Sequence, residues 1–189
     1  MVRAVEIESV SPSRITPRRD GYYSAKIGQS FATAHQTPST DVTGQTSFVA
    51  TTPTFLLYND AAANRILLRD FSLSLVGTAP GGVVHVALAI DTANRYSAGG
   101  TAVVPQNTSG LSSVAATGAF RYGATASAAG AGTRYLRKWS VPAVVGAVLP
   151  VEFDDEVIIG ATGSILIYTW AATTGPTWAF SFGHFEEPA

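Results

Sequence analysis

The fold of this chain is decided by one stretch, Arg65-Ile-Leu-Leu-Arg-Asp-Phe-Ser-Leu-Ser-Leu-Val76. In its second half Phe71, Leu73 and Leu75 alternate with an aspartate and two serines. Because successive side chains of an extended strand point to opposite faces, the aromatic ring and the two leucines share one face. The alternation therefore predicts a long strand in a sheet that buries one of its faces.

The same period of two recurs after this stretch. Residues 83–90 place valine, leucine and isoleucine side chains at every second position, and residues 177–186 do the same with Trp178, Phe180 and Phe182. The Gly/Pro segment 77–82 and the segment 171–176 have the composition of tight turns. We expect each of these segments to be the loop of an antiparallel hairpin, and we expect the aromatic strand to be central in its sheet.

Turn residues separate β-branched and aromatic runs along the rest of the chain, and no window sustains a helical period. The pattern predicts an all-β fold with roughly eight to ten strands, which is typical of an antiparallel β-sandwich and most of all of a jelly roll. A closed up-and-down barrel is the alternative architecture. We also expect an acidic turn at residues 154–156 between two short strands.

Residues 1–47 differ from the remainder because they hold few large aliphatic side chains among many Ser, Thr, Gln and Pro. We predict an N-terminal arm with short strands, one of them at residues 5–8, followed by a sandwich domain at residues 48–189. Such an arm is suited to contact a partner, whose acidic groups or phosphates its basic side chains would meet. These candidate contact residues are Arg3, Arg14, Arg18, Arg19 and Lys26.

Composition argues against several classes of function. The chain is 46% hydrophobic and 13% charged, with a formal net charge of -1, so it has no overall field for nucleic acid or an anionic membrane. It contains no cysteine, which excludes disulfides and thiolate metal sites. No secretory signal or membrane span is evident, and we expect a protein without nucleic-acid or membrane partners.

The sequence singles out no catalytic, cofactor or metal site. His35, His85 and His184 lack the paired spacing of a metal site, and residues 154–156 lack the alternating ligands of a calcium loop. We therefore expect no enzyme activity and no cofactor. A metal enzyme of the cupin type and a glycan hydrolase are the enzymatic alternatives, although three scattered histidines offer little for the first.

Two aromatic side chains outside the strongest core patterns are candidate surface residues. Tyr135 and Trp139 lie in a segment with Arg137 and Lys138, so a surface position is open to both. Exposed aromatic rings are suited to bind glycans. A fibre or receptor-binding module that recognises glycans is therefore the alternative to a purely structural protein.

The stretch Thr54-Phe-Leu-Leu-Tyr-Asn-Asp-Ala-Ala-Ala-Asn64 and the strand after it, with the Gly/Pro loop and Asp91-Thr-Ala-Asn-Arg-Tyr96, resembles structural proteins of tailed bacteriophages. The similarity is greatest to small capsid decoration or cement proteins. The resemblance implies a jelly-roll domain made in the host cytoplasm and mounted on the capsid surface of the virion. It further implies a homotrimer that contacts the major capsid protein and stabilises the phage head through intersubunit contacts, without catalysis.

Overall fold

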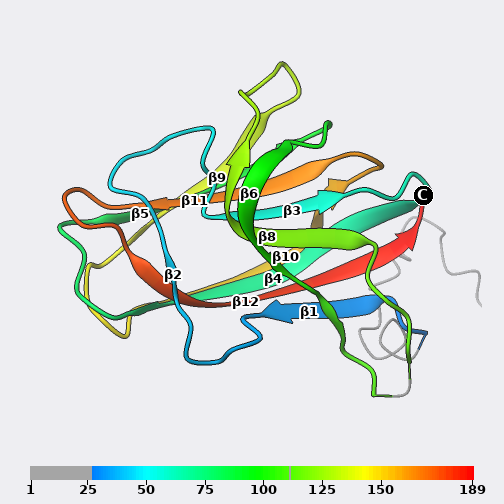
Figure 1. The fold of residues 1–189 in the computed structure, drawn as a ribbon, viewed down its shortest axis with the longest axis horizontal. Helices are drawn as coiled ribbons and strands as arrows, with labels where there is room; N and C mark the ends of the chain where they lie inside the picture. Colours follow the sequence, from blue (N-terminus) through cyan, green and yellow to red (C-terminus); the bar gives the residue numbers. More distant parts are fainter. Residues whose placement is uncertain (1–26, 111) are drawn as a thin grey trace, which may run out of the picture.

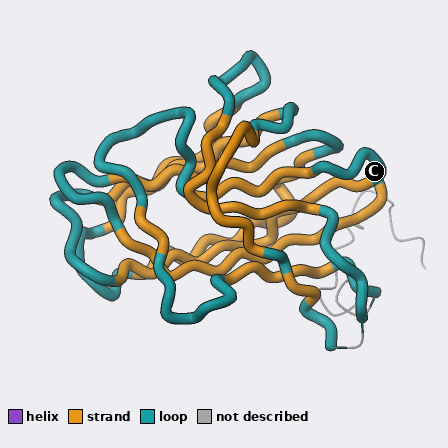
Figure 2. The backbone as a smooth tube through the Cα atoms, viewed as in Figure 1, coloured by secondary structure: helices purple, strands orange, loops and turns teal. Residues whose placement is uncertain are grey.

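The computed structural model describes residues 27–110 and 112–189. These residues form strands, turns and loops, and they contain no helix and hence none that could cross a membrane (Figure 2). The all-β class expected from the sequence is confirmed. In chain order the strands are β1 (Ser30–Ala34), β2 (Val42–Thr43), β3 (Phe55–Asn59), β4 (Asn64–Val76), β5 (Val84–Asp91), β6 (Tyr96–Val103), β7 (Gln106–Asn107), β8 (Gly118–Ala126), β9 (Arg134–Val141), β10 (Val148–Ile159), β11 (Ser164–Trp170) and β12 (Thr177–Pro188).

The strands form two antiparallel sheets. The first has the order β10-β4-β12-β1-β7, with β2 pairing to β12, and the second has the order β6-β8-β3-β11-β5-β9. Figure 1 shows β1, β12 and β4 in one layer and β3 and β11 in the other. Side chains from both layers meet in one hydrophobic core. The predicted antiparallel β-sandwich is confirmed.

The pairings between distant strands are nested in the sequence. β1 pairs with β12, β3 with β11, β4 with β10, and β5 with β9. Each pair therefore lies inside the previous one along the chain, as in one long antiparallel hairpin. Successive pairs belong alternately to the first and the second sheet, so the hairpin is rolled into two layers.

The two hairpins expected around the Gly/Pro loops are absent. Residues 77–82 connect β4 in the first sheet to β5 in the second, and residues 171–176 connect β11 in the second sheet to β12 in the first. Both segments are thus crossovers between layers. The sequence could not distinguish the two arrangements, because a strand with one buried face satisfies its alternation equally well in either sheet.

The core is richest in aromatic rings beside β12, which lies in the middle of the first sheet as expected. The ring centroid of Phe182 lies 4.9 Å from that of Phe120, 5.2 Å from Phe55 and 5.7 Å from Phe71. These rings come from both sheets, and tilted pairs at such distances are favourable beyond the area that they bury. The cluster therefore holds the two layers together.

A bulge interrupts the first sheet at Arg69. On one side of it Leu68 pairs with His184, and on the other Asp70 pairs with Gly183, so the inward positions of β4 change from even to odd numbers. The Arg69 guanidinium lies 5.6 Å from the centre of the Phe185 ring. A Cβ at residue 183 would meet the ends of the Arg69 and Asp70 side chains, which would have to move to make room for it.

The expected acidic turn at residues 154–156 is wrong. These residues belong to β10, and the strand instead shifts its register against β4 between Glu152 and Val157. The shift lies opposite the bulge at Arg69. The strand continues on both sides of the acidic run, but residues 153–156 have no partners on β4.

Part of the predicted arm is built into the sandwich. β1 pairs with β12 along its whole length, and the side chains of Phe31 and Val42 are buried. The basic candidates Arg3, Arg14, Arg18, Arg19 and Lys26 lie outside the described residues. For residues 1–26 the arm stays a prediction.

The segment between β5 and β9 closes one side of the sandwich. Within it β6 and β8 extend the second sheet beyond β3, and β7 extends the first sheet beyond β1. The opposite side ends in β9 and β10, which are the last described strands of their sheets on that side. We call this side, residues 134–159, the open edge.

We predict that Phe182→Ala lowers the free energy of unfolding by about 3–5 kcal/mol, because it removes a ring shared by both layers. The control is Ser181→Ala, since Ser181 is the neighbouring residue and is exposed on the other face of β12. Its effect should stay within about 0.5 kcal/mol. Chemical denaturation measures both values, and equal effects would contradict the assignment of faces.

Candidate functional site

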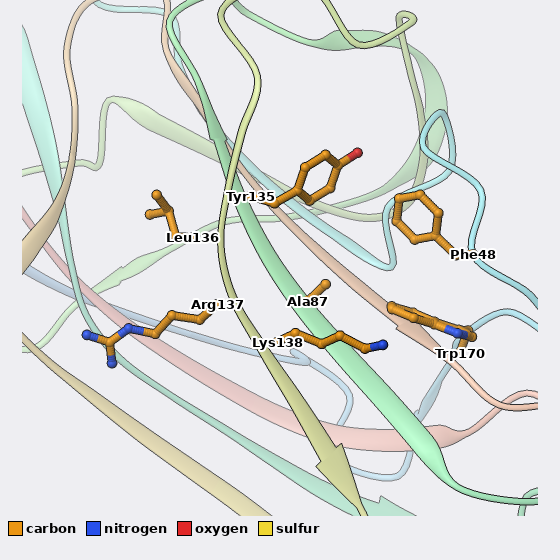
Figure 3. Close-up of a pocket in the computed structure, with 7 residues that line it drawn as sticks. All are labelled: Phe48, Ala87, Tyr135, Leu136, Arg137, Lys138 and Trp170. Carbon is orange, nitrogen blue, oxygen red and sulfur yellow. The ribbon is translucent and has the colours of Figure 1, made fainter.

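The open edge carries a groove on the outer face of the second sheet. Its volume is about 550 Å³, and it opens widely to solvent. Strands β5, β9 and β11 form its floor and one wall, and Phe48, from the segment between β2 and β3, forms the other (Figure 3). The lining residues are Phe48, Ala87, Tyr135, Leu136, Arg137, Lys138 and Trp170.

Phe48 is held in place by other aromatic rings. Its ring centroid lies 5.1 Å from that of Tyr168, 5.3 Å from Trp170 and 5.9 Å from Tyr135. The backbone after Phe48 is anchored, because Tyr168 donates a hydrogen bond to the Ala50 carbonyl at 3.0 Å. Burial, with Tyr135 close by, raises the pKa of the Tyr168 hydroxyl, which therefore stays a donor. The aromatic wall of the groove is thus preorganised.

The chemistry of the groove is apolar with a basic rim. Lys138 extends over Trp170, its Nζ lying 5.5 Å from the ring centroid, a distance at which a cation is attracted to an indole face. None of the described lining residues carries a carboxylate. The groove can therefore accept apolar side chains whose neighbours are negatively charged.

The structure separates the two aromatic residues that the sequence placed together. Tyr135 is about half exposed and lines the groove. Trp139 packs instead against the core, its ring edge-on to Phe71 with centroids 5.6 Å apart. The predicted surface position of Trp139 is therefore corrected.

A bulge at Leu136 causes this separation. Tyr135 pairs with Ala89 and Arg137 with Leu88, so Leu136 has no partner on β5 and the following residues change faces. Figure 3 accordingly shows the side chain of Arg137 pointing away from Tyr135 and Trp170. Regular alternation, which was the only sequence signal, would have kept residues 135, 137 and 139 together.

Exposed apolar side chains line part of the groove and continue along the open edge beyond it. They lie on β9, on β10 and on the turn between them, and their exposed fractions run from 42% to 62%. β6, the corresponding edge strand on the closed side, is composed mainly of glycine, alanine, serine and threonine between its ends. The residues on the open edge are Tyr135, Leu136, Val144, Val145, Val148 and Ile158.

A second candidate is a buried polar cluster near the end of β12. Glu186 is 5% exposed, and its carboxylate accepts hydrogen bonds from the Thr117 backbone and hydroxyl, each at 2.7 Å, and from the Gly118 backbone at 2.8 Å. His184 Nε2 lies 3.2 Å from the same carboxylate. A Cβ at residue 118 would lie 2.6 Å from Ile66, so glycine is needed for this approach.

This cluster is organised as a structural anchor. Because a carboxylate only accepts, the contact with Glu186 places a hydrogen on His184 Nε2, and Nδ1 has no partner among the described atoms. The His184 ring stacks on Phe31, with centroids 5.4 Å apart. The four donors used by Glu186 fix the segment before β8 to β12.

The surroundings of Glu186 shift its pKa strongly. Burial alone would raise it, but the hydrogen bonds from His184, Thr117 and Gly118 outweigh burial and lower the pKa from 4.5 to about 2. The shift corresponds to roughly 3 kcal/mol of stability at neutral pH. This contribution is complete above pH 4.5, the unfolded value, and is lost as the pH falls toward 2.

We predict that Glu186→Gln destabilises the protein at pH 7 and that the difference from the natural chain shrinks as the pH falls from 4.5 to 2. Unfolding by urea at several pH values measures both curves. Glu152→Gln is the control, because Glu152 is exposed on β10. A difference for Glu186→Gln that stays constant over this range would refute the assignment.

A buried ion pair, which the sequence analysis missed, fixes the loops at one end of the second sheet. Arg95 Nη1 lies 2.8 Å from Asp91 Oδ2, and both side chains are almost fully buried. Arg95 also donates to Ser127 at 3.1 Å and to Thr133 at 2.7 Å. Burial opposes the charge on Asp91, but hydrogen bonds from Thr133, Ala93 and Arg95 hold the pKa of Asp91 below its usual value. No sequence pattern indicated this pair, because a spacing of four residues brings side chains together in a helix, whereas Asp91 ends β5 and Arg95 lies in the loop after it.

The other histidines are spread over the surface of the sandwich. His35 Nε2 lies 2.9 Å from the Tyr122 hydroxyl, and His85 lies on the outer face, 3.4 Å from the Ser140 hydroxyl. In the described part of the chain, no three His, Asp or Glu side chains are grouped so that they could hold a metal ion.

Comparisons with models of protein families, with curated proteins and with solved structures found no match.

Proposed function

We propose that this protein is a non-enzymatic structural protein of a phage virion, a capsid decoration protein that stabilises the head by binding copies of itself and the major capsid protein. The observation that carries the proposal is the open edge, where exposed apolar side chains and a preorganised groove adjoin on one side of the sandwich. Contiguous exposed apolar surface with a polar rim is typical of protein contact sites.

The jelly-roll assignment, which is part of this proposal, has support in the strand order. Eight strands occur as β1-β12-β4-β10 in one sheet and β3-β11-β5-β9 in the other. This order is the one produced by rolling a long hairpin into two layers, as in the jelly rolls of viral capsid and lectin domains. The remaining strands are additions at the ends of the sheets.

The chemistry of the groove favours a protein partner over a glycan. Binding a sugar requires hydrogen-bonding groups that converge on its hydroxyls, and the described lining residues offer mainly hydrocarbon, rings and two cations. The feature that favours the alternative, a glycan-binding fibre module, is the pair of rings in the groove, the exposed Tyr135 and the partly buried Trp170. Trp139 does not belong to that surface.

We predict that the purified protein binds expanded phage capsids, raises their resistance to heat, and loses at least tenfold in capsid affinity when Val145 and Val148 are both replaced by lysine. Charges placed on an apolar contact are desolvated without partners. Val104→Lys is the control, because Val104 is exposed after β6 on the closed side. Sedimentation with capsids measures binding.

Absence of any association with capsids, over a range of salt concentrations, would overturn the proposal. Binding on a glycan array that Trp170→Ala abolishes, with the fold retained, would establish the fibre alternative in its place.

A further inference from the structure

Strand β9 is an unusual edge strand because it is long, exposed and basic. Among the described residues it pairs only with β5, so the backbone groups of its other side have no strand beside them. Six of its eight residues are exposed. Its charged side chains are Arg134, Arg137 and Lys138, and it has no acidic residue. An edge of this kind is a template for another extended segment.

The charge of β9 selects against pairing with itself. Two antiparallel copies of Arg134–Val141 would bring basic side chains of one copy beside those of the other, and like charges across a strand pair are destabilising. The bulge at Leu136 also breaks the regular ladder. A short segment that carries carboxylates therefore fits this edge better than a second copy of β9.

The groove adds a second requirement. On the outer face of the second sheet, β9 presents Tyr135 and the groove, whereas Arg134 and Arg137 lie on the other side of the strand. A matching segment needs apolar side chains on the face that meets the groove and carboxylates on the opposite face. In an extended chain this requirement means strict alternation of apolar and acidic residues.

The chain itself contains such a segment at Val5-Glu-Ile-Glu8. If it is extended, Val5 and Ile7 share one face, while Glu6 and Glu8 share the other. The apolar face matches Tyr135 and the groove, and the acidic face matches Arg134 and Arg137. The segment lies 17 residues or more before Ile27, the first described residue, so a long connection is available to carry it away from its own sandwich.

We propose that residues 4–10 of a second copy of this chain add as a strand to the free side of β9, with Val5 and Ile7 at the groove and Glu6 and Glu8 beside the arginines. The second copy is favoured because exposed apolar surface continues from β9 to Val144, Val145 and Val148, which is more than one extended segment covers. The inference rests on the proposed function for its biological role, and it deepens that function by naming the contact that links the copies.

The first test is a charge reversal followed by light scattering on the purified full-length protein. Glu6→Lys with Glu8→Lys should raise the dissociation constant for self-association at least tenfold, and Arg134→Glu with Arg137→Glu should do the same. Combining all four changes should restore association to within about threefold of the natural chain, because opposite charges again face each other. Asp41→Lys is the control at an exposed position before β2.

The second test uses disulfide cross-linking. Because the natural chain has no cysteine, only the introduced cysteines can react. Protein with Ile7→Cys is mixed with protein carrying Tyr135→Cys under mild oxidation, so that a disulfide between the two can form only between copies. We expect a covalent heterodimer in at least tenfold excess over the control mixture, in which Val104→Cys replaces Tyr135→Cys.

Several results would overturn the inference. These are a natural chain that stays monomeric, a charge combination that fails to restore association while circular dichroism shows a folded protein, and a heterodimer yield equal to the control. A single chain carrying both cysteines that forms only an internal disulfide would show that the segment binds its own sandwich. None of these tests uses capsids, so their outcome is independent of whether the protein binds a phage head.

Discussion

The packing of β12 against β4, with alternate side chains of both strands directed toward the second sheet, is the constraint on which the rest of the structure depends. It buries Leu73, Trp178 and Phe182 and fixes the register of the first sheet. Because β10 pairs with the other side of β4 and β1 with the other side of β12, the loops at residues 77–82 and 171–176 carry the chain to the other layer. The nested pairs of the rolled hairpin follow, and β9 and β10 come to lie together on one side.

Strand positions and buried faces could be predicted from the sequence wherever alternation is regular, as in residues 71–75 and 178–182. The pairing partners of the strands could not be predicted, because a turn of Gly and Pro does not reveal which sheet the next strand joins. The predicted faces of side chains were wrong after bulges, which have no clear sequence signal. The bulge at Leu136 directs Trp139 toward the core, and the irregularity beside Glu152 leaves an acidic run inside β10. Of the groove, only Tyr135 was predicted; Phe48 and Trp170 join it through long-range folding.

The two sides of the sandwich differ in physical character. On one side, the segment between β5 and β9 adds strands to both sheets and leaves an edge of small residues at β6. On the other, β9 and β10 expose valine, isoleucine and aromatic side chains beside three basic residues. Two buried polar clusters, around Glu186 and around Arg95, fix the loops, and the second lies beside the start of β9, where Thr133 joins it.

Hydrogen–deuterium exchange of the full-length protein at high and low concentration tests most directly whether the open edge is the contact surface. If copies associate through it, amides of β9 that face away from β5 become protected at high concentration and exchange rapidly on dilution, while those of β6 exchange at the same rate at both. Protection confined to β6, or β9 amides whose exchange does not depend on concentration, would contradict the account.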